Sequence, residues 1–156
     1  MAISFKNVGY KQYEIRRAET VEKSLIPIGI KTPLNFGQNG DGFYEMNYTV
    51  ADQIHDNLKN LLQTNHGERI GRYFYGANLL PVVVEYTNKE DFDSEATIRI
   101  NTAVSDWMPF IILEDFVSRP IYDNNKNIQK IGIVVTYSVP EANISNKAIE
   151  IVLFVI

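Results

Sequence analysis

Apolar residues recur every three or four positions between about Val50 and Thr64, which lays them on one face of a helix: Ile54, Leu58, Leu61 and Leu62. Thr49 and Asp52 have the spacing of an N-terminal capping box. Gly67 follows at a distance that suits a C-terminal cap. This pattern predicts an amphipathic helix.

A second long helix is predicted after a cluster of acidic residues, whose charge suits the N-terminal end of a helix dipole. Its apolar positions share one face: Phe92, Ala96, Ile100, Ala103, Val104 and Trp107. Between the two helices, Pro81 interrupts the apolar stretch from Leu79 to Val84. Because a helix tolerates proline well only in its first turn, either a short helix begins near Asn78 or this stretch is not helical.

The last third of the chain alternates apolar and polar residues, as a strand does. The apolar set of the central segment is Ile131, Ile133, Val135, Tyr137 and Val139. Phe110 to Val117 and Ala148 to Ile156 are predicted as further strands, Asp123 to Asn127 as a hairpin loop, and Pro140 as a strand end. Helices first and strands last predict an α+β fold: an antiparallel sheet of three to four strands packed with two or three helices.

The N-terminal part lacks a clear period. Residues 1–26 are mixed and polar, and we interpret them as an extended N-terminal arm that needs a partner to become ordered. Residues 27–156 are interpreted as a single domain. Pro27 to Pro33 is expected to be extended, because proline biases the residue before it away from the helix. The glycines that follow, Gly37, Gly40 and Gly42, predict a flexible surface loop.

Composition narrows the functional classes. The chain has 156 residues, 45% of them hydrophobic, and a formal net charge of −4. A nucleic-acid-binding surface would need a basic stripe that this balance disfavours. The sequence has no cysteine, so it forms no disulfide and no thiolate metal site. Its start does not resemble a signal peptide, and its apolar runs are too short to span a membrane.

The sequence offers little catalytic chemistry. His55 and His66 lie eleven positions apart, unlike the pair of a helical zinc site, so no metal or cofactor is expected. Glu68 and Glu85 each lie beside apolar sequence and could form the carboxylate pair of a glycosidase. Spacing along the chain does not give the separation of carboxyl groups in space, so this alternative stays open.

Four motifs, in order along the chain, resemble the small baseplate wedge family of contractile phage tails, which is related to the lysozyme-like subunit of type VI secretion baseplates. They are Pro27-Ile28-Gly29-Ile30 with Pro33-Leu34; Leu58-x-x-Leu61-Leu62-x-Thr64-x-x-Gly67-Glu68-Arg69; Tyr75-Gly76-Ala77-Asn78-Leu79 continuing to Val84-Glu85; and Ile131-x-Ile133-x-Val135-x-Tyr137-x-Val139. The second motif is the most specific. The resemblance covers the chain from about Pro27 to Val155.

The resemblance implies a structural role with no catalytic residue. Family members join wedge proteins and start the tail sheath by strand pairing with its first ring. The implied partners are other baseplate wedge proteins, the tail sheath protein and central hub or tube-proximal proteins, with many copies in a symmetric baseplate. The implied location is the virion tail, assembled in the host cytoplasm.

One motif departs from the family, which has Glu-Pro-Arg after the second long helix, in a turn implicated in docking. Here the sequence is Trp107-Met108-Pro109-Phe110. We predict that this turn binds partners together with Glu68 and Arg69, either through apolar contacts in place of the charged ones or in a way that differs from the family. The alternative for Trp107 is that it is the last core residue of its helix. We also predict that Val152 and Phe154 lie on the strand that pairs with the sheath. Two alternatives remain: a baseplate muramidase, and a soluble binding domain unrelated to tails.

Overall fold

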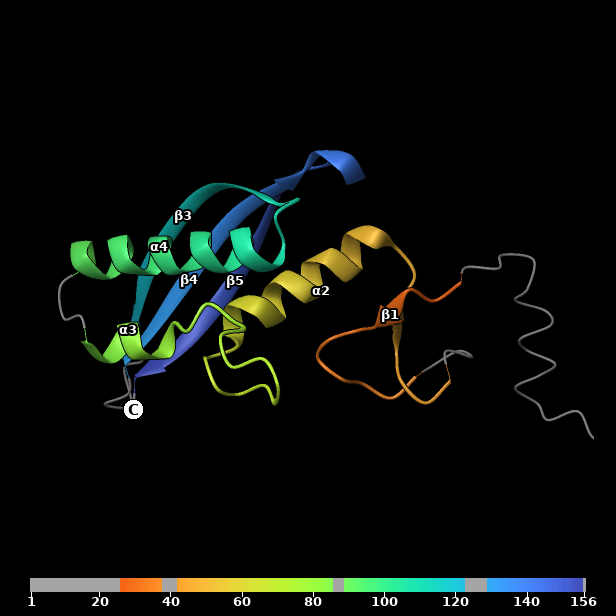
Figure 1. Cartoon of the computed structure of the whole chain (residues 1–156), viewed down its shortest axis with the longest axis horizontal. Coiled ribbons are helices and arrows are strands. Elements are labelled where there is room, and N and C mark those ends of the chain that lie inside the picture. Colours follow the sequence, from red (N-terminus) through yellow and green to blue (C-terminus); the bar gives the residue numbers. More distant parts are fainter. Residues whose placement is uncertain (1–25, 38–41, 86–88, 123–128, 156) are drawn as a thin grey trace, which may run out of the picture. The chain divides into compact units, whose positions relative to one another are not determined.

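The computed structural model of the chain describes residues 26–37, 42–85, 89–122 and 129–155 (Figure 1). It groups them into two compact units, and the boundary lies between Gln53 and Ile54 inside helix α2 (Val50–Gln63). The predicted arm lies outside the described residues except for Ile26, as do Gly40 and the predicted hairpin loop at 123–127. Each unit is described by itself.

The first unit contains a short antiparallel pair of strands, β1 (Gly29–Ile30) and β2 (Met46–Asn47). The amide of Ile28 also donates to the carbonyl of Asn47 over 2.8 Å, which lengthens the pairing. An isolated bridge between Phe36 and Tyr44 continues the ribbon. The extended conformation predicted for this proline-flanked segment is therefore confirmed at β1.

Helix α2 begins where the sequence predicts. The amide of Asp52 donates to the hydroxyl oxygen of Thr49 over 3.1 Å, and that hydroxyl donates to the Asp52 carboxylate over 2.6 Å. The second contact differs from a full capping box, in which the carboxylate would accept the backbone amide of the cap residue. The apolar stripe is buried at Leu58, Leu61 and Leu62.

Two further helices follow in the second unit. Helix α3 (Leu80–Glu85) carries Pro81 in its first turn, so the helical alternative for this stretch is confirmed. Helix α4 (Lys89–Trp107) begins with acidic residues in its first turn, as the helix dipole favours. Its buried residues match the predicted face except at Trp107, which is half-buried: Phe92, Ala96, Ile100, Ala103 and Val104. None of the helices described is long and apolar enough to cross a membrane.

Three long strands form one antiparallel sheet in the order β3 (Ile112–Tyr122), β4 (Gln129–Val139) and β5 (Ile144–Val155). Strand β4 is therefore central, and β3 and β5 are the two edges of this sheet. Together with the three helices, this arrangement confirms the predicted α+β class.

The helices pack on one face of the sheet, in front of it in Figure 1. That face carries the alternating residues of β4, four of which are almost fully buried: Ile133, Val135, Tyr137 and Val139. The hydroxyl of Tyr137 lies 3.1 Å from Nδ1 of His55 on α2. The period-two pattern of the sequence thus defines the inner face of the sheet and the core of this unit.

The strand bounds need correction in two places. Strand β3 starts at Ile112 and continues past Val117, with a bulge between Leu113 and Asp115. The last strand is predicted to begin at Ala148, but β5 already begins at Ile144. The chain reverses through a 3-10 turn at Pro140–Ala142 and a left-handed Asn143. A second left-handed residue, Asn146, lies at a register shift within β5, so the strand continues through an irregularity at this point.

Candidate functional site

Residues 64–79 connect α2 to α3, and we call them the junction loop. Backbone bonds tie its far end to the end of α2: the amide of Ala77 donates to the carbonyl of Leu61 over 3.1 Å, and that of Asn78 to Thr64 over 3.3 Å. These bonds satisfy carbonyls that a helix end leaves unpaired. The prediction that Gly67 caps α2 is therefore wrong: the loop returns to cap the helix, and the amide of Gly67 donates to Tyr73 instead.

Two glycines allow the loop to close. Gly76 has a φ of 113°, and a Cβ atom there would lie 2.1 Å from the carbonyl oxygen of Thr64. Gly67 has a φ of 86°, in the left-handed region that glycine adopts without strain. Gly67 and Gly76, which belong to the second and third family-like motifs, are therefore needed for the backbone geometry of the junction loop, since each permits a close approach within it.

Glu68 is one of the predicted partner-binding residues, and its carboxylate is used inside the loop. It accepts hydrogen bonds from the side-chain amide of Asn65 over 2.8 Å and from the Asn65 backbone amide over 3.0 Å. These bonds favour the charged form and lower the pKa of Glu68 below its usual value. A glycosidase acid needs the opposite shift, toward a raised pKa.

Helix α4 is joined to the junction loop through Arg99. Its guanidinium donates to the carbonyl of Asn78 over 2.9 Å and to Glu95 over 2.8 Å, and Glu85 lies 3.9 Å away. The second glycosidase candidate, Glu85, is therefore an exposed ion-pair partner of Arg99. Asn65 also accepts the amide of Leu80, the first residue of α3. The loop, α3 and α4 are thus held as one polar network.

Aromatic rings connect the loop to the end of α4. The Arg69 guanidinium carbon lies 4.0 Å from the ring centre of Tyr75, and the Tyr75 ring meets Trp107 edge-on with centres 5.0 Å apart. The guanidinium carbon of Arg72 lies 5.3 Å from the centre of the Trp107 ring. Two residues predicted to share a site, Arg69 and Trp107, are therefore brought together through Tyr75, which was not predicted as a site residue.

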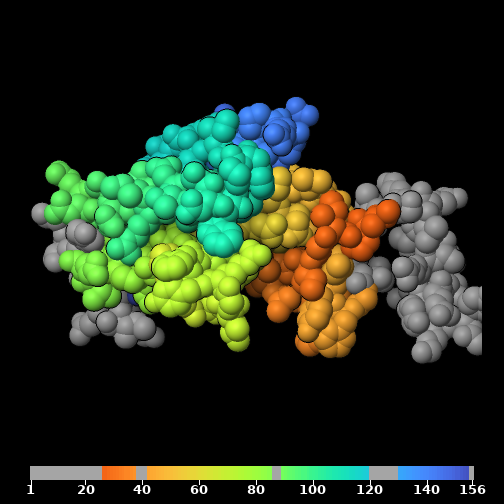
Figure 2. Space-filling model, in the orientation of Figure 1, coloured from red at the N-terminus to blue at the C-terminus, as the bar shows by residue number. Residues whose placement is uncertain are grey.

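The tip of the junction loop exposes large apolar side chains. Ile70 is fully exposed, Tyr73 is 63% exposed and Phe74 is 73% exposed. In Figure 2 the yellow-green surface of this loop lies directly against the teal end of α4. Sequence reasoning missed these three residues, because isolated apolar residues in a polar loop carry no periodic signal.

The turn after α4 separates the four residues predicted to bind a partner. The amide of Ile111 donates to the carbonyl of Met108 over 3.0 Å, which closes the turn. Met108 is buried within the chain, Trp107 is half-buried, and Pro109 and Phe110 are exposed. The exposed part of the predicted docking turn thus consists of Pro109 and Phe110, with one side of Trp107.

Val152 and Phe154, the predicted sheath-contacting residues, lie on edge strand β5 and on the sheet face opposite the helices. They alternate with Ile151, which is buried, and both are partly exposed, at 37% and 51%. Register pairs Val152 with Gly132 and Phe154 with Lys130, whose ammonium lies 5.5 Å from the Phe154 ring centre. The strand predicted to meet the sheath is thus an edge strand, and whether the sheath binds there stays a prediction.

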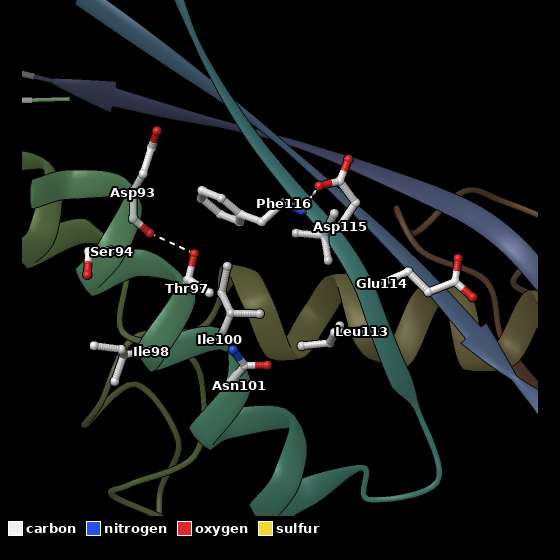
Figure 3. A pocket seen from close by; sticks show the side chains of 11 residues that line it. Asp93, Ser94, Thr97, Ile98, Ile100, Asn101, Leu113, Glu114, Asp115 and Phe116 are labelled. Carbon is white, nitrogen blue, oxygen red and sulfur yellow. Dashed lines mark hydrogen bonds between the residues drawn. The ribbon is translucent and has the colours of Figure 1, made fainter. Parts of the chain in front are cut away.

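An open groove of about 570 Å³ lies between α4 and the other edge strand, β3 (Figure 3). Leu113 and Phe116 point toward the helix, whereas the Glu114 carboxylate leads away from it. Asp93 accepts a hydrogen bond from Ser118. The groove therefore has an apolar wall at Leu113 and Phe116, and the Asp93 carboxylate is already bound by Ser118.

Metal and cofactor sites were not expected, and the described residues contain no cluster of three or more histidine or acidic side chains suited to a metal ion. The two histidines serve separate contacts. His55 lies against Tyr137, and Nε2 of His66 lies 3.2 Å from the carbonyl of Gly76. His66 therefore belongs to the polar network of the junction loop.

No protein-family model and no curated protein matches the sequence. Solved structures do share the fold. One is a chain of the anti-feeding prophage baseplate, resolved by cryo-EM with sixfold symmetrisation: it is 22% identical, with a TM-score of 0.57 over 74% of this chain and 85% of that one. Another is a "putative tail lysozyme" from Geobacter sulfurreducens, 20% identical, with a TM-score of 0.52 over 69% of this chain and 90% of that one.

Proposed function

We propose that this chain is a structural subunit of the baseplate of a contractile phage tail or a related contractile injection system. The observation that carries the proposal is the fold it shares with a baseplate chain of the anti-feeding prophage over 85% of that chain's length. The order of the family-like motifs along the sequence supports the same role. Multiple copies would occupy a symmetric baseplate in the virion.

The finer role we propose is that of a wedge component that starts the tail sheath. Strand β5 supports this role, because an edge strand presents unpaired amides and carbonyls to which another strand can add. The partners would be wedge proteins at the junction loop and the turn after α4, the first sheath ring at β5, and hub or tube-proximal proteins nearby.

We also propose that the chain is not an enzyme. The name of the Geobacter sulfurreducens protein is a reason to test for muramidase activity. The lowered pKa of Glu68 and the ion pair of Glu85 with Arg99 give that alternative no support. The purified chain should not degrade bacterial cell walls at acidic or neutral pH. Activity that Glu68→Gln or Glu85→Gln abolishes in a folded protein would contradict this part.

Localisation is the direct test of the structural role. Contractile particles would be purified from the host, and their baseplate would be imaged by cryo-EM, with this chain fitted into the density. We expect the chain at symmetric positions beside the first sheath ring. Particles that contain sheath and baseplate but lack this chain would contradict the proposal.

A further inference from the structure

Two arginines of the junction loop, Arg69 and Arg72, differ from the nearby Arg99 in their charge partners. Arg99 pairs with Glu95 and Glu85, whereas Arg69 and Arg72 form no ion pair with any of the described residues. Each instead lies over an aromatic ring. A guanidinium stacked on a ring keeps its N–H groups available at its edge, where they fit a carboxylate. The loop therefore holds two unneutralised cations in fixed positions.

The exposed side chains beside these arginines belong to an ordered loop. Besides the bonds to α2, the amide of Gly67 donates to Tyr73 over 2.8 Å, that of Arg72 to Arg69 over 3.2 Å, and that of Tyr75 to Arg72 over 3.1 Å. The rings of Tyr73 and Phe74 pack edge-on with centres 5.1 Å apart. The apolar tip is thus held out into solvent before any partner binds, which lowers the entropy cost of binding.

An open hollow of about 500 Å³ lies beside the tip, lined by residues that include His66, Phe74, Asn78, Asp106 and Trp107. Its aromatic walls suit an apolar side chain. Asp106 is the one carboxylate in its lining, and the one arginine there, Arg99, is already paired with Glu95 and Glu85. Arg69 and Arg72 lie outside the lining. A ligand that fills the hollow would therefore place its own acidic groups against the arginines, away from Asp106.

We infer that the junction loop is a docking site for an extended segment of another tail protein, in which carboxylates flank a large apolar side chain. The apolar side chain occupies the hollow between Phe74 and Trp107, and the carboxylates pair with Arg69 and Arg72. That the partner is a tail protein rests on the proposed function, whereas the acidic and apolar character of the segment rests on the loop itself.

Charge complementarity selects this partner over others. The carboxylate of Glu68 is already bound by Asn65, so it does not neutralise the two arginines. A nucleic acid would need a wider basic surface than two arginines on a chain of net charge −4. A basic or wholly apolar segment would leave both cations unpaired in the interface, which is unfavourable once water is excluded.

The test uses a peptide array that spans the tail proteins encoded next to this chain, probed with the full-length protein. Peptides that bind would be titrated in solution, with the fluorescence of Trp107, the sole tryptophan, as the reporter of this site. The variants are the double charge reversal Arg69→Glu/Arg72→Glu, the single change Phe74→Ser, and Lys89→Glu as a control on an exposed lysine of α4.

We expect the bound peptides to share acidic residues beside an aromatic or aliphatic one, and their affinity to fall with added salt. The double reversal should weaken binding at least about tenfold, Phe74→Ser should weaken it, and Lys89→Glu should leave it unchanged. Peptides with lysine in place of the acidic residues should bind the reversed variant better than the native chain, which excludes misfolding as the cause of the loss.

The inference is overturned if no peptide binds, if the peptides that bind are basic or uncharged, if nucleic acid competes for the same site, or if the reversal leaves affinity unchanged. The proposed function fails separately, if the chain is absent from particles. A chain found in baseplates whose Arg69→Glu/Arg72→Glu variant assembles normally and still binds the same peptides would keep the proposed function and reject this docking site.

Discussion

The two edge strands of the sheet, β3 and β5, flank the same central strand but differ in the side chains they carry. Both β3 and β5 pair with β4 along most of their length, and both contain one register shift. Both therefore have one side of their backbone that no described strand occupies. Geometry alone would let either edge accept a strand from another protein.

Edge strand β3 carries features that discourage strand addition. Pro120 lies within the strand and has no amide to donate. Glu114 and Asp115 at the bulge, and Arg119 further along, place charge along this edge. Bulges, charges and prolines are the devices by which proteins protect an exposed edge from pairing.

Edge strand β5 lacks these devices over its final part. From Ile151 to Phe154 it carries no charge and no proline, and its register shift lies at the other end, near Asn146. Strand addition along this part would be continuous, with Val152 and Phe154 available to set the register. The difference teaches that β5, and not β3, is the edge suited to a partner.

The largest expected effect is in β4, the strand on which both edges depend. Ile133 is fully buried, so Ile133→Ala should lower the free energy of unfolding by about 2–5 kcal/mol through lost burial and a residual cavity. Denaturant unfolding of the full chain measures it. A loss below about 1 kcal/mol would show that the inner face is not the close-packed core on which the comparison of edges rests.

A smaller loss is expected at the end of α4. Trp107 is half-buried against Tyr75 and Arg72, so Trp107→Ala should cost about 1–2 kcal/mol, less than a fully buried tryptophan. Phe74→Ala, at an exposed ring of the same loop, should stay within about 0.5 kcal/mol. Thermal unfolding compares the two. An unfolded Trp107→Ala protein would make Trp107 a core residue and remove it from the docking turn.

The smallest expected effect concerns Glu68 and depends on pH. Its pKa is lowered in the folded chain by the bonds from Asn65, so its contribution to stability is present above its usual value of 4.5 and is lost as pH falls through the folded pKa. Glu68→Gln should therefore be slightly less stable than the native chain at neutral pH and equal to it in strong acid. Glu114→Gln, which removes a carboxylate on the β3 edge, is the control. If the difference in stability between Glu68→Gln and the native chain persists unchanged in acid, the bonds from Asn65 to the charged Glu68 carboxylate are not its cause.

The sheet and its core could be predicted from the sequence, because alternation in β4 and the helical stripes reflect burial on a single face. The period of two alone predicts that Tyr137 and Val135 lie on the buried face. Strand ends were harder, since the left-handed Asn143 directly precedes β5 and the left-handed Asn146 lies at the register shift within it, and neither residue leaves a periodic signal.

The junction loop could not be predicted in the same way. Its form depends on bonds between residues far apart in the chain, such as Asn65 with Leu80 and Arg99 with Asn78. The sequence motifs predict partner binding by both Arg69 and Trp107, whereas Tyr75, which lies between them, stands out in the sequence only as part of a motif. Aromatic and cation–π contacts of this kind follow from the closed loop and not from spacing in the sequence.

Proline substitutions in β5 distinguish amides that bond to β4 from amides that point to the open edge of the sheet. Successive amides of an edge strand alternate between the neighbouring strand and the open edge. Of Val152→Pro and Leu153→Pro, one therefore removes an amide that bonds to β4 and the other removes an amide at the open edge. The variant that keeps the bond to β4 should unfold at the higher temperature. Val152→Ala and Leu153→Ala keep the amide, and each is the matched control for loss of the side chain at its own position.

The central claim, that this subunit starts the sheath along β5, is tested most directly by sheath polymerisation on baseplates that carry the folded proline variant. We expect baseplates to assemble, no sheath to form on the proline variant, and sheaths of normal length to form on the alanine variant at the same position. Normal sheaths on the folded proline variant would contradict the claim, and the first ring would then have to bind elsewhere on the chain.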